Sequence, residues 1–399
     1  MTTAQELEVQ AGLQWMPQQL KAMAATAEQA APQRLCLYFR TGGGKTYTAL
    51  ACVAVAGWRE ALVVAPPITH TAWHEAAARL GMAVETVSHA KFRMPDFKVS
   101  RSMPLIADEF HLFGGHAGKG WKKLDRAAKG LQAPVILASA TPNYNDAERV
   151  YCIQHILDPI GTRGGYLQFL YENCTTEENQ FGSTPLVTGF RSHTDAADYL
   201  SSMPKVVYLP DELEYEIQDI PVADGLTIWN RKYNWFPYMD RIAASLMELR
   251  HMKRKQNLLT SDLTRLKAGV FRQLKDILKQ FPAEDKVLIF CNTATVARAT
   301  QQTFLDAGRY PIYMDGSMTS KFKQQWLNKF INHESYKFLI GTATLATGTD
   351  GIDKVCDHLI ILDDTDDAAL RRQVIGRIMP RGKDSDVSHK TVHRFVLPD

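Results

Sequence analysis

Short, uninterrupted apolar runs recur in two blocks of the chain, with helix-like segments between them. In the first block these runs are LCLYF (35–39), ALVVA (61–65), PLIA (104–107) and PVILA (134–138). In the second block they are KVLIF (286–290), PIYM (311–314), KFLIG (337–341), HLIIL (358–362) and TVHRFV (391–396). Continuous apolar strands that alternate with helices are typical of parallel sheets covered on both faces. The pattern therefore predicts two α/β domains, each a mainly parallel sheet flanked by helices.

The segment between the two blocks differs in composition. Residues 161–202 are rich in Gly, Thr, Asn and aromatic side chains, which predicts short helices and loops. Residues 205–224 carry one base against six acids and contain two prolines, as a crossover between domains would. We therefore expect a first lobe over 1–204, with a short helical protrusion at about 158–203, and a second lobe over 205–399, with a helical, basic insertion at about 225–280.

The overall composition is that of a folded protein. Of the 399 residues, 45% are hydrophobic and 22% charged, which excludes a disordered tail or a fibre. The six cysteines form no C-x-x-C pair and no Cys/His ligand spacing, so neither a zinc module nor disulfide staples are expected. No apolar run reaches the roughly 18 residues of a membrane helix, and the first residues lack a basic secretory region. We expect a soluble, cytoplasmic protein.

A glycine-rich loop follows the first apolar run. The segment RTGGGKTYTA (40–49) lies between LCLYF and an Ala-rich helical stretch, which is the strand–loop–helix order of a phosphate site. Glycines let backbone N–H groups face a polyphosphate, and the helix dipole favours the anion. Lys45 can bridge the terminal phosphates of ATP, and the Thr46 hydroxyl can ligate Mg²⁺. The phosphate loop then comprises Thr41, Gly42, Gly43 and Gly44, with a glycine turn beside a surface lysine as the alternative.

An acidic pair ends another apolar run, in PLIADEFH (104–111). At the end of a strand, Asp108 can hold Mg²⁺ through water and Glu109 can polarise the water that attacks the phosphate. The alternative is an ordinary acidic loop after a strand. Together, the glycine loop and the acidic pair predict an ATPase rather than a passive nucleotide-binding protein.

These and further motifs occur in an order that resembles helicase superfamily II. Asp108-Glu109-Phe110-His111 resembles the D-E-x-H box, and Ser139-Ala140-Thr141-Pro142 resembles the S-A-T coupling motif. The second block carries VLIFCNT (287–293), GTATLATGTDGID (341–353) and RRQVIGRIMPRG (371–382), which are similar to the boxes of the second helicase lobe. The resemblance implies two tandem RecA-like domains that bind ATP and Mg²⁺ between them.

The resemblance also assigns roles to individual residues. It places Gly348, Asp350 and Gln373 in nucleotide binding, and Arg377 and Arg381 as catalytic arginines. It makes His111, Ser139 and Thr141 coupling residues, the alternatives being a satisfied interior histidine and a simple turn. Pro380 occupies the family position of the second arginine, so Arg381 lies one residue late, and we expect the preceding helix to end at Met379.

Within the superfamily, the chain looks most like the Swi/Snf-type DNA translocases. LQWMPQQL (13–20) is similar to the family's L-x-P-x-Q segment, which places Gln19 near the adenine, and VSHAKF (87–92) is similar to its segment before the acidic box. One departure is LFGGHAGKG (112–120), since the family has a lysine soon after D-E-x-H. Candidate contacts to a nucleic-acid backbone are Pro66, Ser88, His89, Asn292, Thr293 and Thr342.

The resemblance implies an ATP-driven translocase on duplex or branched DNA that remodels or branch-migrates it. RNA is a possible substrate, and a monomer working with replication or recombination proteins of a bacterial or viral genome is the expected context. The alternatives are a strand-separating DNA or RNA helicase and a nucleotide-gated binding protein with a vestigial ATPase. The helicase boxes are common to the translocase and the strand-separating helicase, so they do not distinguish these two functions.

The net charge of +3 hides an uneven distribution. Residues 250–279 carry nine bases against two acids, and a second basic run covers 119–129. Each run is either a solvated helix face or a helix that contacts phosphates. The aromatic segment WNRKYNWF (229–236) likewise fits either helix packing or a base-stacking platform. We expect the positive surfaces to border a DNA cleft.

Overall fold

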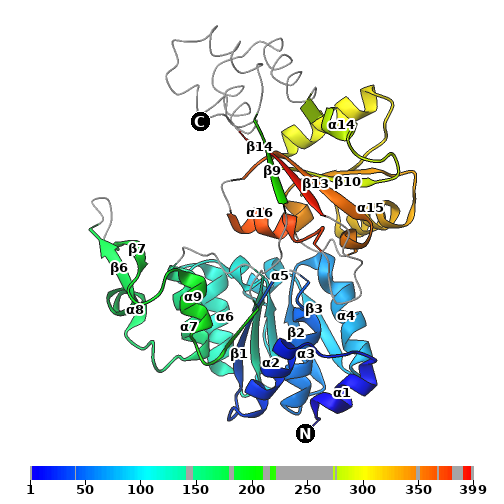
Figure 1. Cartoon of the computed structure of the whole chain (residues 1–399). Helices are drawn as coiled ribbons and strands as arrows, with labels where there is room; N and C mark the ends of the chain where they lie inside the picture. The colour runs from blue at the N-terminus through cyan, green and yellow to red at the C-terminus, as the bar shows by residue number, and fades with distance from the viewer. Residues whose placement is uncertain are drawn as a thin grey trace. The chain divides into compact units, whose positions relative to one another are not determined.

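The computed structural model of the chain forms two compact units, Met1–Glu212 and Leu213–Asp399 (Figure 1). It describes residues 2–40, 42–140, 147–178, 184–209, 216–221, 273–274, 276–346, 351–365, 368–379 and 390–396. The division falls later than the expected boundary at 204/205, because residues 206–209 form a strand of the first sheet. Most of the expected insertion at 225–280, including WNRKYNWF and most of the basic run 250–279, lies outside the described residues.

The first unit contains one six-stranded sheet in the order β3-β2-β4-β5-β1-β8. All of its strand pairs are parallel. The strands are β1 (Arg34–Phe39), β2 (Glu60–Val64), β3 (Ala83–Val87), β4 (Leu105–Asp108), β5 (Val135–Ser139) and β8 (Val206–Leu209). The four apolar runs of the first block are all strands of this sheet, as predicted, whereas β3 and β8 were not anticipated.

Helices cover both faces of this sheet because its strands are apolar on both sides. Along β1, Leu35, Leu37 and Phe39 face one core, while Cys36 and Tyr38 face the other. The first core is covered by α1 (Ala4–Ala11), α2 (Pro17–Ala27), α3 (Lys45–Val55) and α4 (His70–Arg79). The second is covered by α5 (His89–Arg93), α6 (Lys119–Gly130), α7 (Ala147–Leu157) and α9 (Ala196–Ser201), on the opposite side of the sheet in Figure 1.

The protrusion of the first unit contains a hairpin as well as helices. Helix α8 (Gly165–Asn173) leads into β6 (Cys174–Glu177), which pairs antiparallel with β7 (Leu186–Phe190). The expectation of helices and loops alone was therefore incomplete. The two strands are short and mostly half-buried or exposed, so they lack the continuous apolar pattern that marks the central strands.

The second unit repeats the architecture with a sheet in the order β11-β12-β10-β13-β14-β9, again with parallel pairs only. Its strands are β9 (Glu216–Pro221), β10 (Lys286–Cys291), β11 (Ile312–Met314), β12 (Phe338–Gly341), β13 (Cys356–Asp363) and β14 (Thr391–Val396). Its helices include α14 (Ala294–Asp306), α15 (Ser320–Asn332) and α16 (Ala368–Ile375). The two parallel sheets with flanking helices confirm the predicted fold class.

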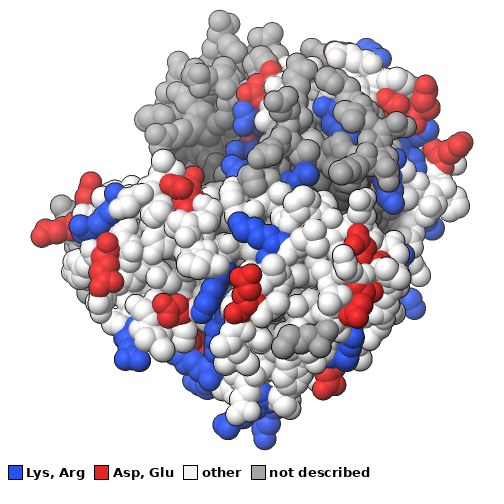
Figure 2. Space-filling view, turned by 60° about the horizontal axis from the view of Figure 1, so that its bottom comes forward, with Lys and Arg blue, Asp and Glu red and all other residues white. Residues whose placement is uncertain are grey.

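Among the described residues, no helix combines the length and hydropathy that crossing a membrane requires. On the face shown in Figure 2, Lys and Arg side chains of the described residues are interspersed with Asp and Glu rather than gathered into one basic patch. On α6, however, the exposed Lys119, Lys122, Arg126 and Lys129 follow one another at helical spacing. That stripe keeps both interpretations of the 119–129 run open.

Candidate active site

The glycine loop joins β1 to α3 in a conformation that requires glycine. Gly42 and Gly44 have φ values of 77° and 79°, in the left-handed region that other residues rarely adopt. At Gly43, a Cβ atom would lie 2.9 Å from Leu209 Cδ2 and 3.0 Å from the Arg40 carbonyl oxygen. The loop therefore presents bare backbone at the N-terminus of α3, as a phosphate site needs. Thr41 lies outside the described residues.

Lys45 and Thr46 form the first turn of α3. The Lys45 ammonium donates to the carbonyl oxygens of Phe39, at 3.2 Å, and of Arg40, at 3.5 Å. Its side chain thus folds back over the loop toward the end of β1. Thr46 is half-buried beside it. Both residues occupy the positions that the sequence predicts for phosphate and Mg²⁺ binding.

Gln19 packs against the same turn. Its Nε2 donates to Thr48 Oγ1 at 3.2 Å and lies 3.5 Å from the Gly44 carbonyl oxygen, while its Oε1 accepts from the Met16 amide at 2.8 Å. A Cβ atom at Gly44 would come within 2.4 Å of Gln19 Nε2, a second reason for glycine there. The side chain is buried and fixed next to the phosphate loop. Its contact with adenine remains a prediction.

The two acids lie at the carboxyl end of β4. Asp108 accepts hydrogen bonds from Trp73 Nε1 at 3.2 Å and from the Glu109 amide at 3.0 Å. Both side chains are buried. Burial, and then the neighbouring charge of Glu109, raise the pKa of Asp108 to about 7, against the opposing effect of Lys45. Glu109 has a φ of 45°, which is unusual for a residue other than glycine and typical of strained functional sites.

Glu109 is linked to the end of the next strand. Ser139, the last residue of β5, donates its hydroxyl to Glu109 Oε2 at 3.3 Å. His111 Nδ1 lies 3.0 Å from Ser139 Oγ and 3.4 Å from Glu109 Oε2. The structure therefore brings the acidic box and the S-A-T motif into one hydrogen-bonded group. Thr141 lies outside the described residues.

The residues at this edge fit a magnesium ion. Asp108 offers a buried carboxylate beside a second one, and Thr46 offers a hydroxyl, which are the hard oxygen ligands that Mg²⁺ prefers. Among the described residues, no group of three His, Cys, Asp or Glu side chains could hold a metal by itself.

In the second unit, Gln373 and Arg377 are both buried. The Arg377 guanidinium donates to the Ala346 carbonyl oxygen, in the 3₁₀ turn that follows β12. Helix α16 ends at Ile375, so the expected end at Met379 was wrong. The Arg377 and Ile378 amides bond to carbonyls three residues back, which tightens the turn. Gly348, Asp350 and Arg381 lie outside the described residues.

The candidate nucleic-acid contacts all follow carboxyl ends of strands in their sheets. Ser88 caps α5 by accepting from the Lys91 amide at 3.1 Å, and Thr293 caps α14 by accepting from the Val296 amide at 3.3 Å. The remaining candidates at strand ends are Pro66, which is buried, Asn292, which is half-buried, and Thr342, which is buried.

His89 differs from the other candidates because its ring points into the first unit. It is buried, with Nε2 2.9 Å from the Asp108 carbonyl oxygen and its ring edge-on to Phe113. Burial lowers its pKa to about 4, so the ring is neutral at physiological pH. The structure therefore places His89 beside the acidic motif, in contact with the end of β4.

Sequence reasoning missed several residues that hold the site. Trp73 bonds to Asp108, and Arg93 and Arg149 donate to main-chain carbonyls of Leu112 and His111. In the second unit, Asp315 accepts hydrogen bonds from Ser317, Tyr313 and Arg298. Of these residues, Trp73 is the large buried aromatic residue of α4, a kind of position that helical periodicity can mark in a sequence.

Residues 269–382 match the family model of the helicase conserved C-terminal domain, and no curated relative matches the sequence. A variant of S. cerevisiae Dbp5 bound to RNA and ADP–BeF3 is 13% identical, covering 98% of this chain and 90% of that one, with a TM-score of 0.57. The Sulfolobus solfataricus SWI2/SNF2 ATPase core in complex with double-stranded DNA is 16% identical, covering 96% of this chain and 88% of that one, with a TM-score of 0.41.

At these identities the likeness to Dbp5 concerns the fold, and that fold consists of tandem RecA-like domains. The match to the helicase C-terminal domain lies in the second unit, where Gln373 and Arg377 are found. Residues 269–382 are therefore similar to the helicase conserved C-terminal domain, and the chain as a whole shares the tandem RecA-like fold of Dbp5.

Proposed function

We propose that this chain is a DExH-type, ATP-dependent motor that moves along nucleic acid, with double-stranded DNA as its track. The observation that carries the proposal is the convergence of Lys45, Asp108 and Glu109 at one edge of the first sheet. Trp73 bonds to Asp108, and Ser139, which His111 contacts, bonds to Glu109. An acid with a raised pKa beside a buried carboxylate and a lysine is a recognised mark of a functional site.

The chemistry follows from these positions. The glycine loop and the α3 amides bind the ATP phosphates, and the Lys45 ammonium leaves the Phe39 and Arg40 carbonyls to reach the terminal ones. Bound Mg²⁺, held through Asp108 and Thr46, would supply positive charge that offsets the charge developing on the phosphates. Glu109 orients the attacking water and accepts its proton.

The second unit supplies the arginines in this proposal. Arg377 and Arg381 complete the neutralisation of charge when the two lobes close on ATP, and Gly348, Asp350 and Gln373 contact the nucleotide. Loss of the terminal phosphate then removes the contact that favoured closure. Ser139 and His111, which are bonded to Glu109, are placed to report that loss to the nucleic-acid grip.

The choice of duplex DNA is supported by the Swi/Snf-like segments 13–20 and 87–92. A strand-separating DNA or RNA helicase is the second candidate, and the Dbp5 variant that shares this fold was solved with bound RNA. A vestigial ATPase is less well supported, because Lys45, Asp108, Glu109 and Arg377 are all present.

ATP turnover measured with duplex DNA, single-stranded DNA and RNA tests the proposal. We expect duplex DNA to stimulate wild-type turnover the most. Lys45→Ala should abolish the stimulated turnover, whereas Lys21→Ala, an exposed lysine of α2, should leave it unchanged. Stimulation by RNA alone would exclude the duplex-DNA assignment, and normal turnover in Lys45→Ala would refute the assigned site.

A forked-duplex assay separates the motor from the second candidate. A translocase is expected to displace a bound protein or a third strand without separating the fork. Unwinding of the fork in step with ATP turnover would favour the strand-separating helicase.

A further inference from the structure

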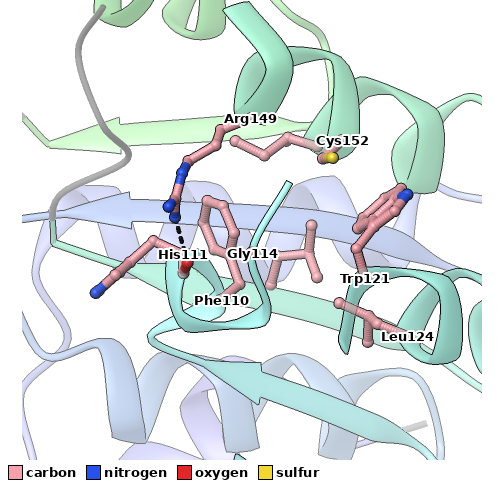
Figure 3. A pocket seen from close by; sticks show the side chains of 9 residues that line it. Phe110, His111, Gly114, Trp121, Leu124, Arg149 and Cys152 are labelled. Carbon is pink, nitrogen blue, oxygen red and sulfur yellow. Dashed lines mark hydrogen bonds between the residues drawn. The ribbon is translucent and has the colours of Figure 1, made fainter. Parts of the chain in front are cut away.

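Two arginines from different helices hold the turn that follows the acidic pair. This turn, η2 (Phe110–Phe113), begins directly after Glu109. Arg149 of α7 donates from Nη1 to the His111 carbonyl oxygen, as Figure 3 shows. Arg93, at the end of α5, donates from Nη2 to the carbonyl oxygen of the next residue, Leu112. Consecutive carbonyls of one turn are thus bound by charged donors from two sides.

The segment 112–120, which departs from the family pattern, is shaped around these contacts. His116 Nδ1 lies 2.5 Å from Glu148 Oε1, the residue next to Arg149 on α7. A Cβ atom at Gly115 would come within 2.3 Å of the Glu148 carboxylate. At Gly120, a Cβ atom would lie 2.5 Å from the Phe113 carbonyl oxygen and 2.9 Å from Arg93 Nε. The glycines therefore leave the space through which α7 and Arg93 approach the turn.

The turn needs such support because the backbone of Glu109, the residue directly before it, is strained. Glu109 is held at φ 45° and ψ 51°, and a backbone of this kind persists only where the surroundings enforce it. Apolar packing buries the turn but supplies no directional bonds: Phe110 lines a hollow together with Trp121 and Cys152 (Figure 3), and Phe113 is buried in the same core. The arginine bonds are directional and charge-assisted, so they can fix the main chain where packing does not.

We propose that Arg149 and Arg93 are positioning residues for the acidic motif. By holding the His111 and Leu112 carbonyls, they keep Glu109 and His111 in register with Ser139. The Glu148–His116 contact holds α7 against the segment 112–120. Because α7 follows the S-A-T motif and η2 follows the acidic pair, this contact links the two motifs. The inference rests on the proposed ATPase function, since alignment of Glu109 matters through the water that it activates.

The test compares Arg149→Ala with Arg149→Lys. We expect Arg149→Ala to lower the kcat for ATP by about tenfold while the KM for ATP stays within about twofold, because the phosphate loop is untouched. A lysine can still donate to the His111 carbonyl, so Arg149→Lys should recover most of the loss. Arg79→Ala, an exposed arginine of α4, is the matched control and should retain wild-type turnover.

Hydrogen exchange of the full chain without nucleotide provides a second measurement, independent of turnover. The Leu112 amide bonds to the Glu109 carbonyl oxygen at 2.9 Å and should exchange faster in Arg149→Ala, while the α3 amides keep their protection. Unchanged exchange at Leu112, unchanged kcat, or equal losses in the Ala and Lys variants would each overturn the positioning role. A wild-type chain without ATP turnover would instead refute the proposed function, and the exchange data would still decide whether Arg149 holds the turn.

Discussion

In each unit a buried aspartate lies at the carboxyl end of a parallel strand, and the pKa values of these two aspartates are shifted in opposite directions. Asp108 ends β4 and Asp315 follows β11 directly. Burial and the charge of Glu109 raise the pKa of Asp108 to about 7. Burial also acts to raise the pKa of Asp315, but hydrogen bonds from Ser317, Tyr313 and Arg298 outweigh it and hold that pKa well below its ordinary value.

The difference lies in the donors around each carboxylate. Asp315 accepts from the Ser317 amide at 2.9 Å, the Ser317 hydroxyl at 2.5 Å, the Tyr313 hydroxyl at 2.6 Å and Arg298 Nη2 at 3.0 Å. Asp108 accepts from Trp73 and the Glu109 amide, and it faces a second acid. The charge of Asp315 is therefore satisfied by the fold itself. The charge of Asp108 is compensated less completely by the fold, as is expected of a functional carboxylate rather than a structural one.

Asp108→Asn should have the largest effect, and only on activity. We expect ATP turnover to fall by at least about 1000-fold, because the ion that the carboxylate would hold carries much of the charge neutralisation. The thermal unfolding temperature without nucleotide should not fall, since the substitution removes a poorly compensated buried charge. Calorimetry and a turnover assay check both parts, with exposed Asp96→Asn as the control. A clear loss of stability would make Asp108 a structural residue like Asp315.

Glu109→Gln should lower turnover by about 100-fold while ATP binding stays within about threefold of wild type. Glutamine keeps an oxygen that can accept from the Ser139 hydroxyl, now 3.3 Å away, but it cannot take a proton from water. Single-turnover hydrolysis and binding of a fluorescent ATP analogue separate the two effects. Wild-type turnover in this variant would refute the role of Glu109.

The same comparison shows what the sequence could predict. Asp108 and Glu109 could be singled out from the sequence because their signal is local: they form an acidic pair directly after an apolar run. Asp315 was not, because its role depends on Arg298, 17 residues away on α14. The contacts of Trp73 and Arg149 likewise span 35 and 38 residues. A linear motif shows which groups do the chemistry, whereas the groups that orient them are set by packing.

The strands follow the same logic. Central strands were predicted because both of their faces are buried and their sequences are continuously apolar. Strand β3 (AVETV) lies at a sheet edge and is mostly half-buried or exposed, and β9 (EIQDIP) lies beside β14 at the edge of the other described sheet. Edge strands bury less surface, so their apolar signal is weaker than that of the centre.

Asp315→Asn should reverse the pattern expected for Asp108. The variant loses charge-assisted hydrogen bonds at a buried site, so the second unit should lose about 2 kcal/mol of unfolding free energy. Nucleotide binding by the first unit should not change. Chemical denaturation is the measurement, and Asp306→Asn, at the exposed end of α14, is the control. Equal stability of the two variants would show that the hydrogen bonds around Asp315 do not depend on its charge.

Lowering the pH should remove the contribution of the Asp315 charge to the stability of the second unit. Because its folded-state pKa lies below the ordinary value of 3.8, the carboxylate stabilises the second unit fully above that pH, and the contribution is lost as the pH falls toward the folded pKa. The gap in unfolding free energy between wild type and Asp315→Asn should therefore be constant from neutral pH to about pH 5, then shrink by up to about 1.4 kcal/mol for each further pH unit. Asp306→Asn should parallel wild type throughout. A gap that stays constant down to about pH 3 would mean that the Asp315 charge is not what the surrounding donors stabilise.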